Sequence, residues 1–441
     1  MSAIWNRETF SRFAAALAQA ERLPRPALET YCNSLRRRLV SFAYRESPFY
    51  RDRLQPLFRG GDEPDLRAWT EIPILSRDDL SRESERINPA ALPEEMGTVS
   101  VLRTSGTTSA RMSFRTCDLA RLAAECMMHR LYRWHGFHLK APLASIRYYG
   151  SGRRNYPDGI TEPSWCLLES APHYTLDLRT SIDNMIDWLS RRRPAYLLTF
   201  PSIAQDLAHH PQAGRIGELG LKDIVAISEI VSSDARDDVR RMLHCGMAQI
   251  YACAEMGCIA LQSETDEQCL ICEETVHVEI LNRRGEPVGP GENGRVVLTS
   301  LYNYATPLIR YEIGDYATLS DLPCSAGRSL QGLQRITGRR RNALLARDGS
   351  RRWEHAVIDG PLLQEIGDHV FQIRQPDLDT IELAYIWDGA ARPAPNQAAV
   401  ADYFAGLLGG PVDLRITPVK EIARSTGGKR ERIVSAVASC Q

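Results

Sequence analysis

Residues 195–228 read AYLLTFPSIAQDLAHHPQAGRIGELGLKDIVAIS, and this segment indicates the fold class. Its two ends, 195–200 and 223–228, are short apolar runs of the length typical of buried strands. Between them, SIAQDLAHH at 202–210 has apolar residues at helical spacing. A strand, a helix and a second strand in this order predict a parallel pair joined by a crossover helix.

The same alternation extends outward over residues 100–260. LASIRYYG (143–150) and AQIYACA (248–254) are strand-like, and DLARLAAECMMHRLYRWHG (118–136) is helical. After residue 273, strand patterns interrupted by Gly and Pro predict hairpins, and ITGRRRNALLARDG (336–349) indicates a boundary. We predict an α/β fold, with a large N-terminal domain over 1–337 and a small α+β domain over 338–441.

Composition narrows the possible functions. A chain of 441 residues is too long for one ordinary core. Its 54 basic and 55 acidic side chains leave a net charge of −1, which argues against nucleic acid as a partner. We find no apolar run of membrane length and no signal peptide, so we expect no membrane partner. The 11 scattered cysteines then predict reduced thiols in a cytoplasmic protein.

A stretch rich in hydroxyl groups lies at 101–114, VLRTSGTTSARMSF. Hydroxyl and backbone N–H groups can donate to phosphate oxygens, and Gly106 lets the backbone approach closely. The spacing is not that of a Walker A loop. On composition alone an exposed Ser/Thr loop is the commoner explanation, so a phosphate loop needs support from other segments.

Two other motifs have structural explanations. Gly289-Pro290-Gly291-Glu292-Asn293-Gly294 fits G-x-G-x-x-G, but it contains a proline and precedes a strand, which predicts a hairpin turn. The pair Cys269–Cys272, with Cys253 and Cys258, matches no standard zinc spacing. We interpret these cysteines as buried free thiols.

Four further segments follow the hydroxyl-rich stretch in order: YACAEMG (251–257), YNYATPLIRYEIGD (302–315), ITGRRRNALL (336–345) and ARSTGGKRER (423–432). Together with SPFYRDRL (47–54), PILSRDDL (73–80), TSGTTS (104–109) and FPSIAQDLA (200–208), they resemble the adenylate-forming superfamily of acyl-CoA synthetases, in particular its phenylacetate–CoA ligase-like branch. The resemblance covers nearly the whole chain, and ATPLIRYEIGD (305–315) is its most specific part. It implies a large N-terminal α/β domain and a small mobile C-terminal domain.

The resemblance implies an activity. Such enzymes activate a carboxylic acid with ATP and Mg²⁺, which gives an acyl-adenylate and pyrophosphate. A thiol, usually that of coenzyme A, then displaces AMP. For this chain we therefore expect a small acid as substrate, with an aromatic acid favoured, and coenzyme A as the co-substrate.

The resemblance also assigns roles by position. Glu255 would bind Mg²⁺, and Lys429 would bridge the attacking carboxylate and the α-phosphate; with Thr108, these are the predicted catalytic residues. Tyr251 and Ala252 would surround adenine with the backbone near Ser228 and Glu229, Asp315 would bind the ribose, Arg339 the ribose or phosphate, and Arg341 would stand at the hinge. The β- and γ-phosphates would lie on Thr104, Ser105, Gly106, Thr107, Thr108 and Ser109.

The acid pocket is predicted from apolar and aromatic residues at strand ends. Such residues suit an acyl or aryl group, although they are just as often part of a core. The candidates are Tyr148, Tyr149, Gly150, Phe200, Pro201 and Ser202.

The chain departs from the family pattern in four places. Ser109-Ala110-Arg111 replaces Gly-Lys-Pro, and Ile227-Ser228-Glu229-Ile230 replaces Gly-Ala-Glu-Pro. Arg341-Asn342 stands where paired aspartates are usual. Cys324-Ser325-Ala326-Gly327-Arg328 stands where related sequences often have Cys-x-Cys-Gly-Arg and keeps only the first of the two cysteines, so we predict no zinc.

These departures leave two alternatives open. The acceptor could be a carrier-protein thiol or an amine in a biosynthetic pathway rather than coenzyme A. The chain could also be a nucleotide-binding descendant without catalytic activity. A homodimer is expected from the family alone.

Overall fold

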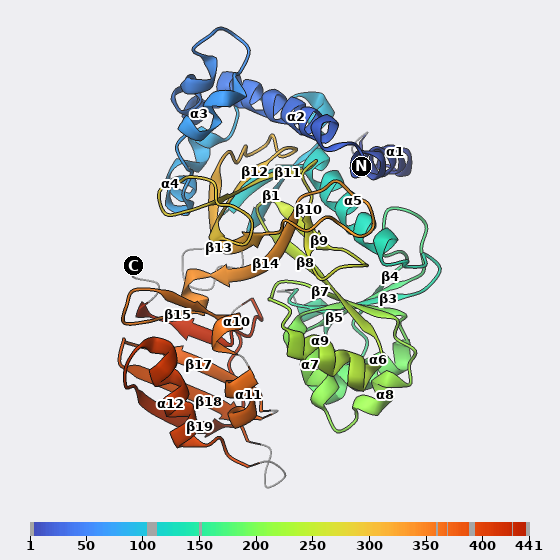
Figure 1. Ribbon diagram of the computed structural model, residues 1–441. Helices are drawn as coiled ribbons and strands as arrows, with labels where there is room; N and C mark the ends of the chain where they lie inside the picture. Colours follow the sequence, from blue (N-terminus) through green and yellow to red (C-terminus); the bar gives the residue numbers. More distant parts are fainter. Residues whose placement is uncertain are drawn as a thin grey trace. The chain divides into compact units, whose positions relative to one another are not determined.

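The computed structural model describes residues 4–103, 113–149, 152–358, 360–367, 369–387, 393–425 and 427–437. The chain divides into two compact units (Figure 1). The larger comprises Met1–Ile313 and Ala317–Ile336, and the smaller comprises Gly314–Tyr316 and Thr337–Gln441. The mobility of the smaller unit stays a prediction.

Most strands belong to one sheet. They are β3 (Leu143–Arg147), β4 (Ile160–Glu162), β5 (His173–Asp177), β6 (Tyr196–Thr199), β7 (Asp223–Ala226), β8 (Gly246–Cys253), β9 (Gly257–Gln262), β10 (Cys269–Ile271), β11 (Val276–Leu281), β12 (Asn293–Ser300), β13 (Tyr311–Leu319) and β14 (Gly332–Arg339). The 12 strands follow the order β11-β12-β13-β14-β10-β9-β8-β7-β6-β3-β5-β4. Strands β5, β3, β6, β7 and β8 pair in parallel, whereas β4–β5, β8–β9, β9–β10, β10–β14 and β11–β12 are antiparallel. The predicted α/β fold is confirmed.

The strand–helix–strand unit at 195–228 has the predicted form. Helix α7 (Pro201–His209) connects β6 to β7, which pair in parallel with Thr199 opposite Ala226. All four residues of β6 are buried because both faces of this part of the sheet are covered. Tyr196 and Leu198 pack into one core, and Leu197 into another with α6 (Ile182–Arg192) and α7. Figure 1 shows α6, α7, α8 (Ala213–Gly217) and α9 (Ser233–Asp238) together on that second face.

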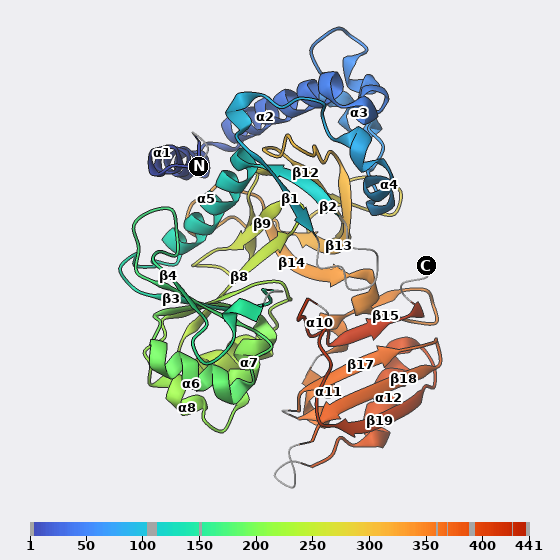
Figure 2. The same cartoon turned by 180° about the vertical axis from the view of Figure 1, so that it is seen from behind.

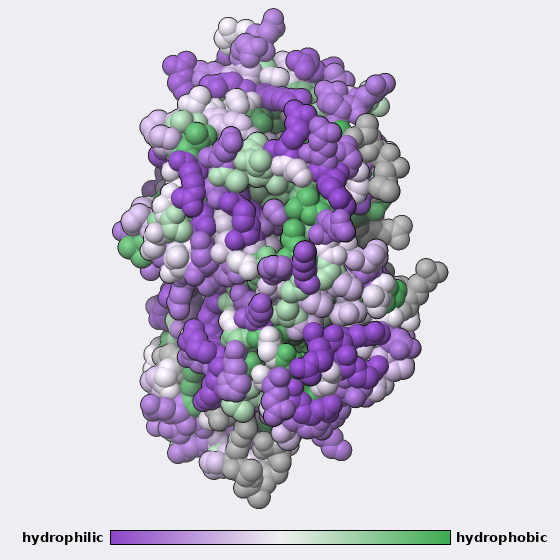
Figure 3. All heavy atoms as spheres, turned by 90° about the vertical axis from the view of Figure 1, so that its right-hand side faces the viewer, coloured by the Kyte–Doolittle hydropathy of each residue, from purple (hydrophilic) through white to green (hydrophobic). Residues whose placement is uncertain are grey.

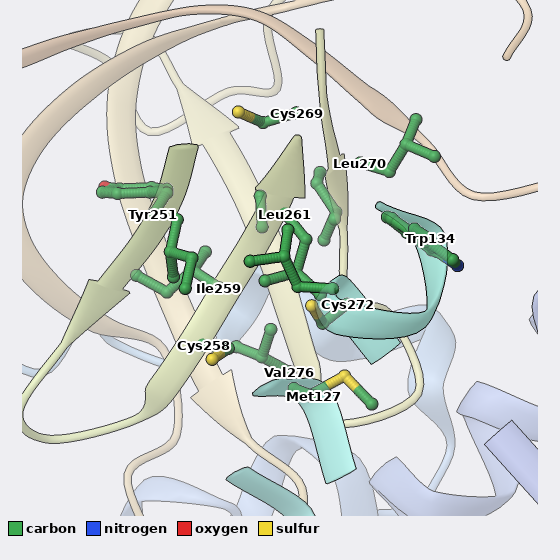
Figure 4. Close-up of a cluster of buried hydrophobic side chains, with 14 of the residues drawn as sticks. Met127, Trp134, Tyr251, Cys258, Ile259, Leu261, Cys269, Leu270, Cys272 and Val276 are labelled. Carbon is green, nitrogen blue, oxygen red and sulfur yellow. The ribbon is translucent and has the colours of Figure 1, made fainter. Parts of the chain in front are cut away.

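The first core lies between α5 (Asp118–Trp134) and the antiparallel strands β8, β9 and β10. Figure 4 shows Met127 and Trp134 of α5 facing Ile259, Leu261 and Leu270. Helix α1 (Arg7–Ala20) lies beside α5 in both ribbon views (Figures 1 and 2). These packed apolar side chains hold the β8–β9 turn, which carries Glu255, against a rigid helix.

The N-terminal helices follow their sequence signals. Helix α2 (Arg25–Glu46) ends directly before Ser47-Pro48, because the residue before a proline is disfavoured in the helical conformation. Ser76 caps α4 (Arg77–Ile87), since its hydroxyl accepts from the Asp79 amide at 3.0 Å. The remaining elements here are α3 (Pro48–Arg53) and a two-stranded ribbon of β1 (Val99–Arg103) and β2 (Ser113–Cys117).

The glycine-rich motif at 289–294 lies where β12 begins. Because β11 and β12 pair antiparallel, with Leu281 opposite Arg295, this segment closes a hairpin. Gly291 has φ +79°, a conformation that suits glycine in a turn. The prediction of a hairpin turn rather than a dinucleotide loop is confirmed.

The smaller unit is α+β, as predicted. Its four-stranded sheet has the order β19-β18-β17-β20, formed by β17 (Phe371–Gln375), β18 (Thr380–Ile386), β19 (Asp413–Val419) and β20 (Ile433–Ser435). Helix α12 (Gln397–Leu408) contributes Phe404 to the core that Ile373, Leu383 and Ile433 share. Other elements are β15 (Ala343–Leu345), β16 (Arg351–Trp353), α10 (Glu354–Val357) and α11 (Gly360–Ile366).

A buried arginine joins distant parts of the larger unit. Arg310 is 2% exposed, and its guanidinium pairs with Glu279 of β11 at 3.0 Å. It also donates to the carbonyl oxygens of Thr70 and Ile72, at 2.8 and 2.6 Å. The Leu75 amide in turn donates to the Arg310 carbonyl oxygen at 2.8 Å. Arg310 thus ties the start of β13 to β11 and to the segment before α4.

None of the helices in the described ranges combines the length and apolar character that a bilayer crossing needs. The face in Figure 3 is mostly hydrophilic, with hydrophobic residues in small areas.

We predict that Arg310→Met destabilises the larger unit by about 3–5 kcal/mol, because it leaves the mostly buried Glu279 carboxylate unpaired. Urea unfolding followed by tryptophan fluorescence measures the change. The control Arg59→Met removes an exposed pair with Glu71 and should cost less than about 1 kcal/mol. Equal effects of the two substitutions would contradict the anchoring role of Arg310.

Candidate functional site

Several predicted site residues lie at one edge of the sheet. Tyr148 follows the end of β3, Phe200 follows β6, and Ser228 lies two residues beyond β7. Ala226 of β7 pairs with Gln249 of β8. Ser228 and Tyr251 each lie two residues further along, and so they are at the same height in the sheet. In open α/β sheets the carboxyl ends of parallel strands form the usual ligand site. The fold therefore gathers the predicted acid and adenine residues at the expected place.

A direct contact joins the two predicted segments. The Glu229 carboxylate accepts from the Ser202 amide at 3.0 Å and from the Ser202 hydroxyl at 3.1 Å. A carboxylate at this position stabilises the N-terminus of α7. The Glu229 side chain is therefore engaged with the protein, which leaves the backbone of this segment for the predicted adenine contact.

The backbone beside Glu229 adopts an unusual conformation. Ser228 has φ +71°, in the left-handed region that non-glycine residues rarely enter. Strain of this kind is frequent at ligand sites. It indicates that the 227–230 turn is held in a defined shape although it lacks the family's glycine.

The predicted acid-pocket residues have different environments. Phe200 is 3% exposed and packs into the core beneath the sheet edge, with Pro201 and Ser202 also buried. Tyr148 is 38% exposed. Two guanidinium groups contact the Tyr149 ring, that of Arg147 at 5.0 Å and that of Arg154 at 4.3 Å from its centre. Contact of these residues with an acid stays a prediction, and Gly150 lies outside the described residues.

The predicted phosphate end borders a cavity of about 100 Å³. Leu102 and Phe114, on either side of the undescribed stretch 104–112, line this cavity together with Glu255. All six predicted phosphate-loop residues, Thr104, Ser105, Gly106, Thr107, Thr108 and Ser109, lie in that stretch. Glu255, the predicted metal residue, therefore lines the same cavity as residues on both sides of the predicted phosphate loop.

Glu255 also contacts the 302–315 motif. The Tyr311 hydroxyl donates to Glu255 Oε1 at 3.4 Å. Burial, and after it the charge of Glu255, raises the pKa of Tyr311, so the phenol stays protonated and remains a donor. Two motifs that are far apart in the sequence meet at this hydrogen bond.

A bulge shapes the predicted adenine segment. The register of β8 against β9 shifts between Tyr251 and Ala252, and such irregularities redirect side chains near active sites. Figure 4 shows the Tyr251 ring at the edge of the hydrophobic cluster, with its hydroxyl pointing away from it. Ala252 is exposed, and both roles stay predictions.

The two predicted ribose residues lie together in the smaller unit. Asp315 follows Gly314, which has φ +83°, and its carboxylate pairs with Arg339 Nε at 3.5 Å. Asp315 comes from β13 and Arg339 from β14, which are neighbours in the sheet. An acceptor and a donor side by side can bind a ribose hydroxyl pair.

The predicted lysine lies in a tight loop of the smaller unit. The Ser425 amide donates to the Lys429 carbonyl oxygen at 2.8 Å, and the Lys429 amide donates to the Ser425 hydroxyl at 3.1 Å. Arg341 pairs with Glu431, two residues further on, at 2.6 Å. This pair explains how an arginine is accommodated at the predicted hinge, and sequence analysis had not identified Glu431.

The structure also holds an arrangement that resembles a catalytic triad. Ser145 Oγ is 2.7 Å from His173 Nε2, and His173 Nδ1 is 3.0 Å from Glu162 Oε2. However, Ser145 is 2% exposed and lies within β3, between β5 and β6. A nucleophile must be reachable by its substrate, so these residues join strands rather than act on a ligand.

The cysteines are consistent with free thiols. Burial raises the pKa of Cys258 and of Cys269 to about 12. Figure 4 shows the sulfur atoms of Cys258, Cys269 and Cys272 pointing to different places. Within the described ranges, no group of three or more His, Cys, Asp or Glu side chains could hold a metal ion. The absence of zinc stays a prediction.

Two curated proteins are similar in sequence to this chain. The phenylacetate–coenzyme A ligase of Thermus thermophilus is 26% identical over 362 residues, 75% of this chain and 74% of that protein. The protein of the same name from Escherichia coli is 34% identical over 116 residues, 25% and 26% of the two chains. No family model matches the chain.

These similarities support the resemblance of this chain to the adenylate-forming superfamily, in its phenylacetate–CoA ligase-like branch.

Solved structures show the same superfamily fold. A 2-hydroxyisobutyryl-CoA ligase, in the postadenylation state with R3-HIB-AMP, matches with a TM-score of 0.75 at 18% identity, over 96% of this chain and 93% of that one. The same ligase with 2-HIB-AMP and CoA, in the thioesterification state, matches with a TM-score of 0.61 at 20% identity, over 95% and 91%. The adenylate-forming fold thus extends over nearly the whole chain.

We predict that Glu229→Ala speeds hydrogen exchange of the first amides of α7. Loss of a cap costs about 1 kcal/mol, which corresponds to roughly fivefold faster exchange. Exchange mass spectrometry of a peptide covering 198–207 measures this, with the exposed Glu218→Ala as control. Unchanged exchange in Glu229→Ala would show that the contact with Ser202 does not hold the helix start.

Proposed function

We propose that this chain is an AMP-forming acid–thiol ligase that activates a small carboxylic acid and transfers the acyl group to coenzyme A. The observation that carries the proposal is the contact of Glu255 with Tyr311 at a cavity that Leu102 and Phe114 also line. It joins the predicted metal residue to the motif that leads to Asp315, next to the residues that flank the predicted phosphate loop. The two curated relatives, both phenylacetate–coenzyme A ligases, support it.

The reaction has two steps. First, a carboxylate oxygen attacks the α-phosphorus of ATP, and the bond from that phosphorus to the bridging oxygen of the β-phosphate breaks. This gives an acyl-adenylate and pyrophosphate. Second, the deprotonated thiol attacks the acyl carbon, the bond to the phosphate oxygen of AMP breaks, and a thioester forms.

The chain's own residues bind and orient the reactants. The hydroxyl and amide groups of 104–109 bind the β- and γ-phosphates, and the backbone at Ser228 and Glu229 holds adenine against Tyr251. Asp315 and Arg339 bind the ribose, and Lys429 neutralises charge that develops between the carboxylate and the α-phosphate. Preorganised contacts of this kind stabilise the transition state by a few kcal/mol each.

Mg²⁺ fits this arrangement. It commonly binds through one or two carboxylates together with substrate phosphates, so a cluster of protein ligands is not needed. Glu255 is half-buried at the cavity, and Tyr311 holds one of its oxygens. When bound, the ion withdraws negative charge from the phosphates.

We propose a small aromatic acid as the substrate. The names of the two curated relatives support this choice, as does the presence of Tyr148 and Tyr149 at the sheet edge. A cytoplasmic location, a homodimer and a carrier-protein partner stay predictions.

We predict that Lys429→Ala reduces acid-dependent exchange between ATP and pyrophosphate by about 100-fold or more, because the charge at the α-phosphate is no longer neutralised. The control is Lys420→Ala, which changes an exposed lysine of the same unit. Exchange at the wild-type rate in Lys429→Ala would remove the lysine from the mechanism. If a broad panel of small acids gives no exchange with the wild-type protein, the non-catalytic alternative replaces the proposal.

The acceptor is tested separately. With an acid that supports exchange, coenzyme A should release AMP and yield the thioester, as detected by mass spectrometry. Acyl-adenylate that persists in the presence of coenzyme A would favour a carrier-protein thiol or an amine, the alternative suggested by the altered hinge at Arg341.

A further inference from the structure

The cavity that Leu102, Phe114 and Glu255 line also contains a polar side chain without an assigned role. Asn303 lines the cavity with Glu255 and is 2% exposed. It lies between β12 and β13, in the loop that leads to Arg310 and Tyr311. Its amide therefore belongs to the same rigid segment that positions the Tyr311 hydroxyl against Glu255.

The orientation of the Asn303 amide is fixed by its neighbours. Its Nδ2 donates to the carbonyl oxygen of Arg115 in β2 at 3.0 Å. A carbonyl oxygen only accepts, so the NH₂ group must face Arg115 and the oxygen must face elsewhere. That oxygen, Oδ1, is buried and has no hydrogen-bond partner among the residues that the structure describes. Buried polar atoms without a partner are rare and often indicate a bound ion or water.

The surroundings favour a hydrated cation. The Asn303 oxygen and the Glu255 carboxylate only accept, and the hydroxyl groups of Thr116 and Ser300 at the same cavity can accept as well. Amide and carboxylate oxygens are typical partners of Mg²⁺ and of the waters it retains. Arg121, the cationic side chain at this cavity, pairs with Asp118 at 3.2 Å and stacks on Trp5. Its charge is thus already balanced within the protein.

We propose that Asn303 is a second protein group for the divalent cation that enters with ATP, and that its Oδ1 accepts a hydrogen bond from one of the cation's waters. The inference rests on the proposed function, because the cation is brought by the nucleotide. Glu255 then binds the cation from one wall of the cavity, and Asn303 holds its hydration shell from another. Such outer contacts commonly change metal affinity by about 10–100-fold.

Binding measurements test this role without relying on turnover. The probe is α,β-methylene-ATP, titrated by calorimetry with Mn²⁺ and again with EDTA. The tightening that Mn²⁺ produces reports the cation's contacts with the protein. In Asn303→Leu, we expect the Mn²⁺-induced gain in affinity for α,β-methylene-ATP to be about tenfold smaller than in the wild-type protein. The affinity measured in EDTA should be unchanged.

A second variant separates this role from a structural one. Asn303→Asp also loses the bond to Arg115 but keeps an oxygen, so it should retain the Mn²⁺ effect while both variants melt at lower temperature. Asn33→Leu on α2, where the amide bonds Arg36 instead, is the control for removal of a partly buried asparagine. If Mn²⁺ increases the affinity of Asn303→Leu for the analogue as much as it does for the wild-type protein, the role of Asn303 is wrong but the proposed function is unaffected. If the wild-type protein binds no nucleotide, the proposed function is wrong as well.

Discussion

The structure depends on a buried guanidinium group. Arg310 has φ +51° and contacts Glu279 and two backbone carbonyl groups, and this fixes where β13 begins. The next residue, Tyr311, is thereby placed to donate to Glu255, and Gly314 and Asp315 follow along the same strand. A buried charge is tolerated only when it is fully paired, so this arrangement has little freedom to shift. One ion pair therefore sets the position of Tyr311, which donates to the residue proposed to bind the metal.

Each unit contributes a different part of the proposed chemistry. The larger unit presents the residues proposed to bind adenine and the acid at the carboxyl edge of its parallel strands, and Tyr311 donates to Glu255. The smaller unit presents Asp315 beside Arg339, and Lys429 in a loop closed by Ser425. Its Arg341–Glu431 pair joins the predicted hinge to the residues after the lysine. A residue change at the hinge therefore has a matching partner within the same unit, which argues for retained function rather than decay.

Much of the fold could be predicted from sequence because its signals are local. The strand–helix–strand unit at 195–228, the cap at Ser76 and the hairpin at Gly291 each depend on neighbouring residues alone. The contacts of Arg310 with Thr70 and of Ser202 with Glu229 join segments that no local pattern relates. Asn303 was missed for the same reason, since its burial and its unpaired oxygen arise only after distant strands meet. The motif order located the candidate site, while tertiary contacts decide which side chains are engaged with the protein and which face a ligand.

The central claim is that separate segments of both units act on one nucleotide. A crystal structure of the protein with α,β-methylene-ATP and Mn²⁺ tests it most directly. The account predicts phosphates at residues 104–109, Mn²⁺ beside Glu255, adenine against Ser228 and Tyr251, and the ribose hydroxyls on Asp315. A nucleotide bound elsewhere, or bound with its phosphates away from Glu255, would contradict it.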